Sequence, residues 1–259
     1  MSLIYGEVES ELRNTNLSRL TPISPYFSGS AGRVLFYEDF EDEILRGWNY
    51  FDDNETGSYY NLTDTIKFSG KRSLHIRSPQ VNTTTNAHLD LIKIFPFTIP
   101  TGSNPLIGME VAFTFSRAFV GLGGPQLRFG LSTWDGTNRR DFYMRYNKGS
   151  HLWFWGASET ESGSQRLEPY EPATNPLARS TGVWHKAKLI VDPFNDKYIS
   201  FICNGATQSV SGSQSLKESD GSITVAGANI FRCFLRATSG TTVGQEVDVW
   251  FDDVVITSE

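Results

Sequence analysis

The chain has 259 residues, of which 39% are hydrophobic and 20% charged, and its formal net charge at pH 7 is −6. A hydrophobic fraction in the ordinary range for folded proteins argues against wholesale disorder. The acidic balance and the lack of a Lys/Arg stripe argue against nucleic acid as a partner. No stretch approaches 18 apolar residues, so we expect no membrane insertion.

Residues 1–32 differ in composition from the rest of the chain. Their apolar residues are sparse, and "TPISPYFSGSAGR" has the composition of a Pro/Ser/Gly linker. Alone, such a segment buries too little apolar surface to offset its ordering entropy. We therefore expect an N-terminal extended arm over residues 1–32 that contacts other protein chains, in a capsid or in self-assembly, and one domain over residues 33–259.

Period-2 alternation of apolar and polar residues dominates after the arm, and no helical pattern of ten residues appears there. Asn204-Gly205 directly follows one strand-like run and predicts a type I′ hairpin. The pattern predicts an all-β fold, a two-sheet antiparallel β-sandwich or jelly roll. The main predicted strands cover residues 34–40, 107–115, 126–134, 141–146, 151–155, 183–192, 198–203, 229–237 and 247–256.

Cys203, Cys233 and His185 each alternate with apolar neighbours. The two cysteines are interpreted as buried core thiols, with a cross-sheet disulfide as the alternative, because free cysteine behaves as a small hydrophobe. His185 is interpreted as a hydrogen-bonded core histidine. None of the four histidines has the spacing of a metal site or a catalytic triad.

Carboxylates crowd the stretch "FYEDFEDEILRGW", and a second acidic pair, Asp252-Asp253, lies near the C-terminus. "YEDFED…GW", "SGKRSLHIRS" and "VDVWFDDVVI" together resemble the skeleton of carbohydrate-binding-module jelly rolls. "GVWHKAKLIVDPFNDKYISFICNG" resembles a strand pair of concanavalin-A-like lectin and glucanase sandwiches. Jelly rolls of this kind often place their first and last strands side by side.

That resemblance implies a structural calcium held by Glu41, a backbone carbonyl of the 69–72 region and Asp252, with Asp39 and Asp253 in reserve. Calcium takes six to eight oxygen ligands, and a cation would offset the repulsion among these acids. The alternative is that the acids are simply solvated at a strand end.

Catalysis is the less favoured interpretation of the acids. Lectin-like glucanases carry alternating acids on one strand, but in "YEDFEDEI" Phe40 stands where the central acid should be. A polysaccharide lyase would need a Tyr/His/Arg group on one sheet face, which Tyr143, Arg145 and His151 could supply. We therefore expect no enzyme.

Aromatic residues gather in "YMRYNKGSHLWFWG", where Trp153 and Trp155 share one face of their strand. A four-residue hairpin loop that pairs Tyr146 with His151 would put Phe142, Met144 and Tyr146 beside the tryptophans. A three-residue loop would put Tyr143 and Arg145 there instead. Core packing is the main alternative to sugar stacking. The candidate glycan-binding residues are Trp134, Tyr143, Arg145, Trp153 and Trp155, with Trp134 expected to be the more exposed.

The favoured interpretation is a non-enzymatic structural or binding protein on a phage particle, a capsid decoration or accessory protein. It would lie on the virion surface after synthesis in the host cytoplasm, with cell-surface glycan as a possible second partner. The alternatives are an extracellular glycan-binding module and, less favoured, a polysaccharide-acting hydrolase or lyase.

Overall fold

The computed structural model describes twelve segments of the chain, and every statement below concerns those residues. They are 33–52, 57–79, 88–95, 106–116, 126–134, 139–147, 152–156, 164–167, 183–209, 216–218, 230–240 and 246–258. The expected arm over residues 1–32 lies outside them. No helix among the described residues is long and apolar enough to cross a membrane.

Sixteen strands make up the regular structure of the described residues. They are β1 (Arg33–Glu38), β2 (Trp48–Asp52), β3 (Tyr59–Thr63), β4 (Ser73–Ser78), β5 (His88–Phe95), β6 (Ile107–Phe115), β7 (Gln126–Trp134), β8 (Arg139–Asn147), β9 (Leu152–Gly156), β10 (Ser164–Leu167), β11 (His185–Asp192), β12 (Lys197–Cys203), β13 (Ala206–Ser209), β14 (Leu216–Glu218), β15 (Ile230–Thr238) and β16 (Val247–Ser258).

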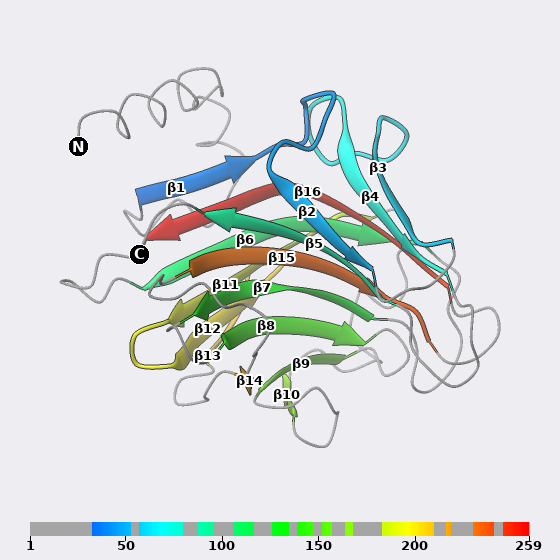
Figure 1. The fold of residues 1–259 in the computed structure, drawn as a ribbon. Coiled ribbons are helices and arrows are strands. Elements are labelled where there is room, and N and C mark those ends of the chain that lie inside the picture. Colours follow the sequence, from blue (N-terminus) through cyan, green and yellow to red (C-terminus); the bar gives the residue numbers. More distant parts are fainter. Residues whose placement is uncertain are drawn as a thin grey trace, which may run out of the picture.

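These strands form two antiparallel sheets that pack face to face as a sandwich (Figure 1). The β6 sheet has the order β13-β12-β11-β6-β16-β4-β3, with β1 also paired to β16. The β7 sheet has the order β10-β9-β8-β7-β15-β5-β2, with β14 also paired to β8. The predicted all-β jelly roll is confirmed.

Alternation placed most of the long strands well, but it missed the eight-residue β5 and several short strands. Strands β6 and β7 have the predicted bounds, whereas β2, β3 and β5 were not predicted. The first and last strands pair, as expected, with Arg33 opposite Ser258. The predicted hairpin connects β12 to β13, where Asn204 and Gly205 both have the positive φ, 49° and 86°, of a type I′ turn.

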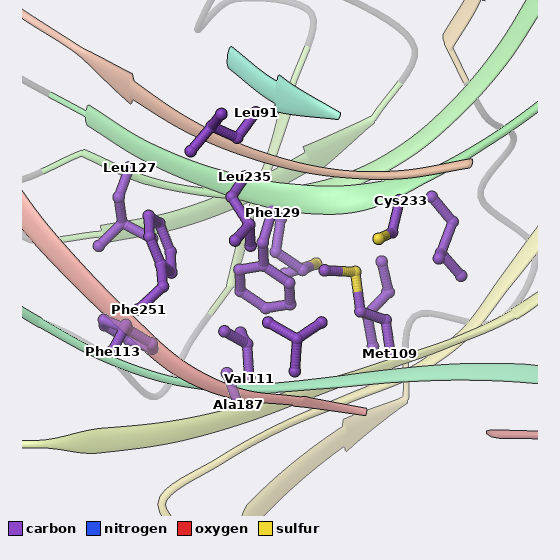
Figure 2. Packing of buried hydrophobic residues seen from close by; sticks show 14 of the residues in the cluster. Leu91, Met109, Val111, Phe113, Leu127, Phe129, Ala187, Cys233, Leu235 and Phe251 are labelled. Carbon is purple, nitrogen blue, oxygen red and sulfur yellow. The ribbon is translucent and has the colours of Figure 1, made fainter. Parts of the chain in front are cut away.

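The core lies between the two sheets. Figure 2 shows Leu91, Phe129 and Leu235 of the β7 sheet facing Val111 and Ala187 of the β6 sheet, all of them buried. Both cysteines are free thiols, fully buried in this cluster, so the interpretation as core thiols is confirmed.

One edge of β8 is shared by two short strands, which leaves a gap between them. β14 pairs with Arg139–Asp141 and β9 pairs with Arg145–Asn147. Tyr198 of β12 reaches across the sandwich into this gap, and its hydroxyl accepts a hydrogen bond from the Tyr143 backbone N–H at 2.9 Å. An unpaired buried N–H would cost about 1–3 kcal/mol. By accepting a hydrogen bond from this N–H, Tyr198 lets one edge of β8 pair with β14 in one part and with β9 in another without that loss.

His185 is a core histidine held in one neutral form. Asn204 Oδ1 accepts a hydrogen bond from the Lys186 N–H, which turns the amide so that Asn204 Nδ2 donates to His185 Nδ1 at 3.0 Å. The ring lies against Phe113 and Phe115 and is 3% exposed. Burial lowers the pKa of His185 from 6.5 to about 4.

The lowered pKa predicts acid destabilisation that depends on His185. Between pH 6.5 and 4 the unfolded chain binds a proton at this position and the folded chain does not, so stability falls as the pH falls. Replacing His185 with Phe should remove this component, which amounts to roughly 2–3 kcal/mol between pH 7 and 4.5. Urea unfolding of both proteins at the two pH values measures it. Equal losses of stability in the two proteins would show that His185 is not the responsible group.

Candidate functional site

The acidic pair near the C-terminus lies at an irregularity in the middle of the β6 sheet. The register of β16 against β6 shifts between Asp252 and Val255, and Asp253 has a positive φ of 46°. Asp252 is fully buried, and its Oδ2 accepts hydrogen bonds from the backbone N–H groups of Phe68 and Ser69 at 3.0 and 3.1 Å. Asp252 therefore anchors the turn that leads into β4.

Asp253 and Glu41 hold the same region from two other sides. Asp253 Oδ1 accepts hydrogen bonds from the Tyr37 hydroxyl at 2.8 Å and from Ser69 Oγ at 3.1 Å. Glu41 Oε1 accepts from the backbone N–H groups of Lys71 and Arg72 at 2.6 and 3.0 Å. Both acids thus tie the 66–72 turn to the end of β1 and to the residues that follow it.

The crowded stretch of acids divides into half-buried hydrogen-bond acceptors and solvated side chains. Glu38 accepts hydrogen bonds from the Phe40 N–H and from Trp48 Nε1, and Asp39 accepts one from the Glu41 N–H. Asp42 and Glu43 are exposed, with side chains 69% and 90% accessible. The interpretation that the acids are solvated at a strand end fits Asp42 and Glu43. It is wrong for Asp252 and Asp253, which are buried in β16.

Burial raises the pKa of several of these carboxyl groups. The pKa of Asp252 rises to about 8, first because the group is desolvated and second because Asp253 carries a like charge. Desolvation is also the largest cause that raises the pKa of Glu38 and Asp39. A cation beside these groups would offset both effects.

The geometry fits the expected calcium site only in part. Within the described segments, no group of three or more His, Cys, Asp or Glu side chains is arranged to hold a metal. Glu41 and Asp252 direct oxygens at N–H donors. Asp253 Oδ2, in contrast, is buried and has no hydrogen-bond partner among the described residues. Calcium stays a prediction, and it depends more on Asp253 than on Glu41.

A second candidate site lies on the outer face of the β7 sheet. In β5, β15, β7 and β8, which lie side by side (Figure 1), alternate residues enter the core cluster and the others face away from it. Because paired residues of antiparallel strands share a face, cross-strand rows can be followed through the register. The central row runs Ile92, Phe234, Gly130, Tyr143.

Tyr143 and Phe234 form a small apolar cluster of their own, separate from the core, with Ile92 packed against it. Gly130 stands between these two aromatic residues in the row. A Cβ at Gly130 would lie 2.2 Å from the Phe142 carbonyl oxygen, so no larger residue fits there without moving backbone. We call this central row the apolar strip.

Charged rows flank the apolar strip on both sides. On one side Asp90, Arg236, Arg128 and Arg145 are directly paired in that order. Arg236 binds Asp90 with two hydrogen bonds, from Nε at 2.5 Å and from the terminal nitrogen at 2.7 Å. The Arg128 guanidinium lies 5.4 Å from the centre of the Tyr143 ring, within cation–π range.

The row on the other side contains Arg232, Ser132 and Asp141. Asp141 lies 3.0 Å from Arg139 Nε and 3.9 Å from the Arg232 guanidinium. Across the four strands, the residues that face away from the core include five arginines (128, 139, 145, 232 and 236) and two aspartates (90 and 141). These seven side chains carry a formal charge of +3 in a chain whose net charge is −6, and four of them, Arg128, Arg145, Asp90 and Asp141, are buried.

The predicted glycan residues are brought together only in part. Tyr143 and Arg145 lie on this outer face, 2% and 1% exposed. The expectation that Trp134 is exposed is wrong, since it is 6% exposed. It ends a central strand whose backbone is paired on both sides, with Ile230 and Arg139 as the partners of Trp134.

The β8–β9 register separates the tryptophans from Tyr143 and Arg145. The hairpin loop has four residues, 148–151, so Asn147 pairs with Leu152 and Tyr146 with Trp153. The pairing of Tyr146 with His151 is thus wrong by two positions, but the same face results. Trp153 and, by alternation, Trp155 fall on the sheet face of Met144 and Tyr146, two core residues.

Sequence reasoning missed Arg128, Arg236 and Phe234. A signal was present, because "QLRFG" and "FRCFLRA" place arginines at alternate positions between apolar residues. That these three residues are neighbours could not be predicted, since it depends on the strand order β8-β7-β15-β5. No local sequence pattern specifies that order.

No protein-family model and no curated protein matches the sequence. Solved structures are similar in fold. An endo-β-1,4-glucuronan lyase from the fungus Trichoderma reesei is 15% identical with a TM-score of 0.56, over 87% of this chain and 96% of that one. Lectin I-B4 from Griffonia simplicifolia is 11% identical with a TM-score of 0.52, over 86% and 98%.

A carbohydrate esterase from the Shiga toxin-encoding bacteriophage phi24B is 12% identical with a TM-score of 0.50, over 88% of this chain and 99% of that one. At these identities the likeness concerns the fold alone. It confirms the resemblance to the jelly rolls of lectins and carbohydrate-active proteins.

The buried acids Asp252 and Asp253 predict that calcium stabilises the protein and that this stabilisation depends on Asp253. If calcium binds there, adding it to chelator-treated protein should raise the melting temperature, by an amount equivalent to roughly 2.7 kcal/mol at a hundredfold excess over Kd. Asp253→Asn should abolish this increment, and Asp42→Asn, at an exposed acid, should preserve it. A melting temperature that calcium leaves unmoved would argue against the site.

Proposed function

We propose that the protein is a carbohydrate-binding jelly roll that holds a saccharide on the outer face of the β7 sheet. The observation that carries the proposal is the apolar strip of Tyr143 and Phe234 between two rows of arginine and carboxylate side chains. Pyranose rings have apolar faces that stack on aromatic residues and hydroxyl groups that need polar partners at the ring edge.

The similar solved structures support this proposal without carrying it. They include proteins described as a lectin, a glucuronan lyase and a carbohydrate esterase, so the fold serves both binding and catalysis on carbohydrates. For this chain we propose binding without catalysis, because the charged residues of the outer face in the described strands are mainly arginines, which hold charge rather than transfer protons.

The binding surface should depend on the aromatic ring of Tyr143. Tyr143→Ala should weaken saccharide binding at least tenfold, about 1.4 kcal/mol, because the ring contact is lost. Tyr59→Ala is the control on the other sheet, where this tyrosine is 42% exposed against 2% for Tyr143. A glycan array followed by calorimetry on the best ligand measures the effect, with melting curves to show that Tyr143→Ala is folded.

The same experiment tests the absence of catalysis. Prolonged incubation with the bound polysaccharide should release neither reducing ends nor unsaturated products. Appearance of either product would make the protein an enzyme. Failure of the chain to bind any saccharide, or equal loss of binding in Tyr143→Ala and Tyr59→Ala, would remove the proposed site.

We also propose that the protein acts as an accessory protein on a phage particle. The composition of residues 1–32 and the existence of a phage protein with a similar fold support this role. Removing residues 1–32 should leave the melting temperature within a degree or two and abolish co-sedimentation with phage capsids or self-association. If truncation unfolds the sandwich, the segment is part of the domain and the assembly role is wrong.

A further inference from the structure

We propose that β3 is an edge at which a second copy of this chain adds its own β3, antiparallel, about a two-fold axis beside Asn61. We call this pairing the β3 contact. It is independent of the saccharide site and rests on the proposed assembly role, in which residues 1–32 supply the other contact between chains. β3 lies at one end of the β6 sheet (Figure 1), and among the described strands it pairs with β4 only.

The side chains of β3 are more exposed than those of the other strands. Burial is described for every residue of eight strands, and β3 is the only one of the eight without a buried residue. Tyr59 and Tyr60 are 42% and 36% exposed, and they are two of the five large hydrophobic residues exposed in the described segments. Apolar surface that gathers at one place is typical of a contact with another molecule, whereas single exposed residues are ordinary.

The sequence of β3 lacks the features that protect a sheet edge from pairing. An edge strand presents N–H and C=O groups to solvent, and folded proteins usually block such strands with charges, proline or bulges. The five residues YYNLT include no charge and no proline, and their register against β4 has no shift. β3 therefore has nothing of its own that would repel a further strand.

The ring of Tyr59 is held in place by the rings behind it. It meets the His75 ring edge-on, with 5.3 Å between centroids, and His75 stacks on Trp250 at 4.6 Å. Asn61 and Asp248 contact the two nitrogens of His75, at 3.2 and 2.8 Å. A side chain that is already held loses little entropy on binding, so Tyr59 is suited to anchor a contact.

A second copy of β3 fits this edge better than a charged strand would. A two-fold axis beside Asn61 would pair each aromatic residue with an aliphatic or β-branched one, which is a favourable combination across strands. The pairs would be Tyr59–Thr63, Tyr60–Leu62 and Asn61–Asn61. Each chain has a net charge of −6, so two copies repel each other, and an uncharged strand is where they can approach at least cost.

The β3 contact is small, which is why it depends on a larger assembly. Five paired residues extend about 17 Å along each strand. A stable interface between proteins buries about 1,200–2,000 Å², more than one short strand supplies. The β3 contact therefore adds to an association that residues 1–32 bring about.

Cysteine cross-linking of the full chain tests the two-fold register. In Asn61→Cys the two introduced thiols would face each other across the axis, so mild oxidation should give a disulfide-linked dimer that reductant separates. The native cysteines are buried and do not take part. Thr207→Cys is the matched control, at an exposed position of β13 at the other end of the same sheet. It should cross-link roughly tenfold more slowly, because only random collisions bring its thiols together.

Charge variants test the same contact without a covalent bond. Asn61→Lys and Asn61→Asp each place like charges opposite each other, so each alone should weaken self-association in sedimentation velocity about fivefold, the upper end of one cross-strand pair. An equal mixture of the two should restore association, because opposite charges then face each other. Thr207→Lys should leave it unchanged. Melting curves check that each variant is folded, and if Asn61→Lys is not, the cross-linking of Asn61→Cys decides.

The outcomes separate the β3 contact from the proposed assembly role. Equal cross-linking at positions 61 and 207, or equal losses in Asn61→Lys and Thr207→Lys, overturns the β3 contact and leaves the role of residues 1–32 standing. Association that survives removal of residues 1–32 but is lost in Asn61→Lys overturns the assembly role and leaves the β3 contact standing. A full chain that stays monomeric at every concentration overturns the β3 contact and leaves only capsid binding to residues 1–32.

Discussion

The sandwich depends on β16, because one edge of this strand pairs with two different strands. Its first half pairs with β4 and its second half with β1, and the register against β6 shifts where the partner changes. Asp252 and Asp253 occupy this position, one anchoring the 66–72 turn through backbone N–H groups and the other accepting the Tyr37 hydroxyl. The acids therefore close the chain's first strand against its last, and this closure brings both ends of the domain into one sheet.

Alternate residues of each strand give the β7 sheet two different surfaces, one that packs in the core and one that faces away from it. Residues such as Phe129 and Leu235 fill the core, while their sequence neighbours Arg128 and Arg236 face the other way. At Gly130 the packing of the two surfaces is linked, because the backbone of β8 comes so close to β7 that no side chain fits there. Tyr198 contributes from the opposite sheet by satisfying the backbone of Tyr143. The apolar strip is therefore positioned by core packing rather than by loops.

The sequence predicted what depends on local pattern. Alternation identified the long strands, Asn204-Gly205 predicted a hairpin, and acidic motifs at both ends predicted that the end strands pair. It could not predict what depends on pairing order. Arg128 and Arg236 are 108 positions apart in the chain and become direct neighbours only because β15 pairs with β7. The roles of the acids depended likewise on contacts across 183 and 184 positions. Trp134 was misjudged because the end of a strand was taken for the edge of a sheet.

The proposal of binding without catalysis depends on where the described proton-transfer groups of the outer face lie. Cleavage requires a group that gives a proton to the glycosidic oxygen or takes one from a ring carbon, and this group must reach the same sugar that the site binds. Guanidinium groups keep their protons at any ordinary pH. In the register, His88 pairs with Thr238 at the end of β5, three strands and two further rows away from Tyr143. Three strand spacings alone come to about 14 Å, so the histidine and the tyrosine cannot act on one sugar residue. Asp90 and Asp141 are already bound to arginines. In the part of the chain that the structure describes, His88 therefore lies apart from Tyr143 and the two aspartates are engaged, which supports the proposal of binding without catalysis.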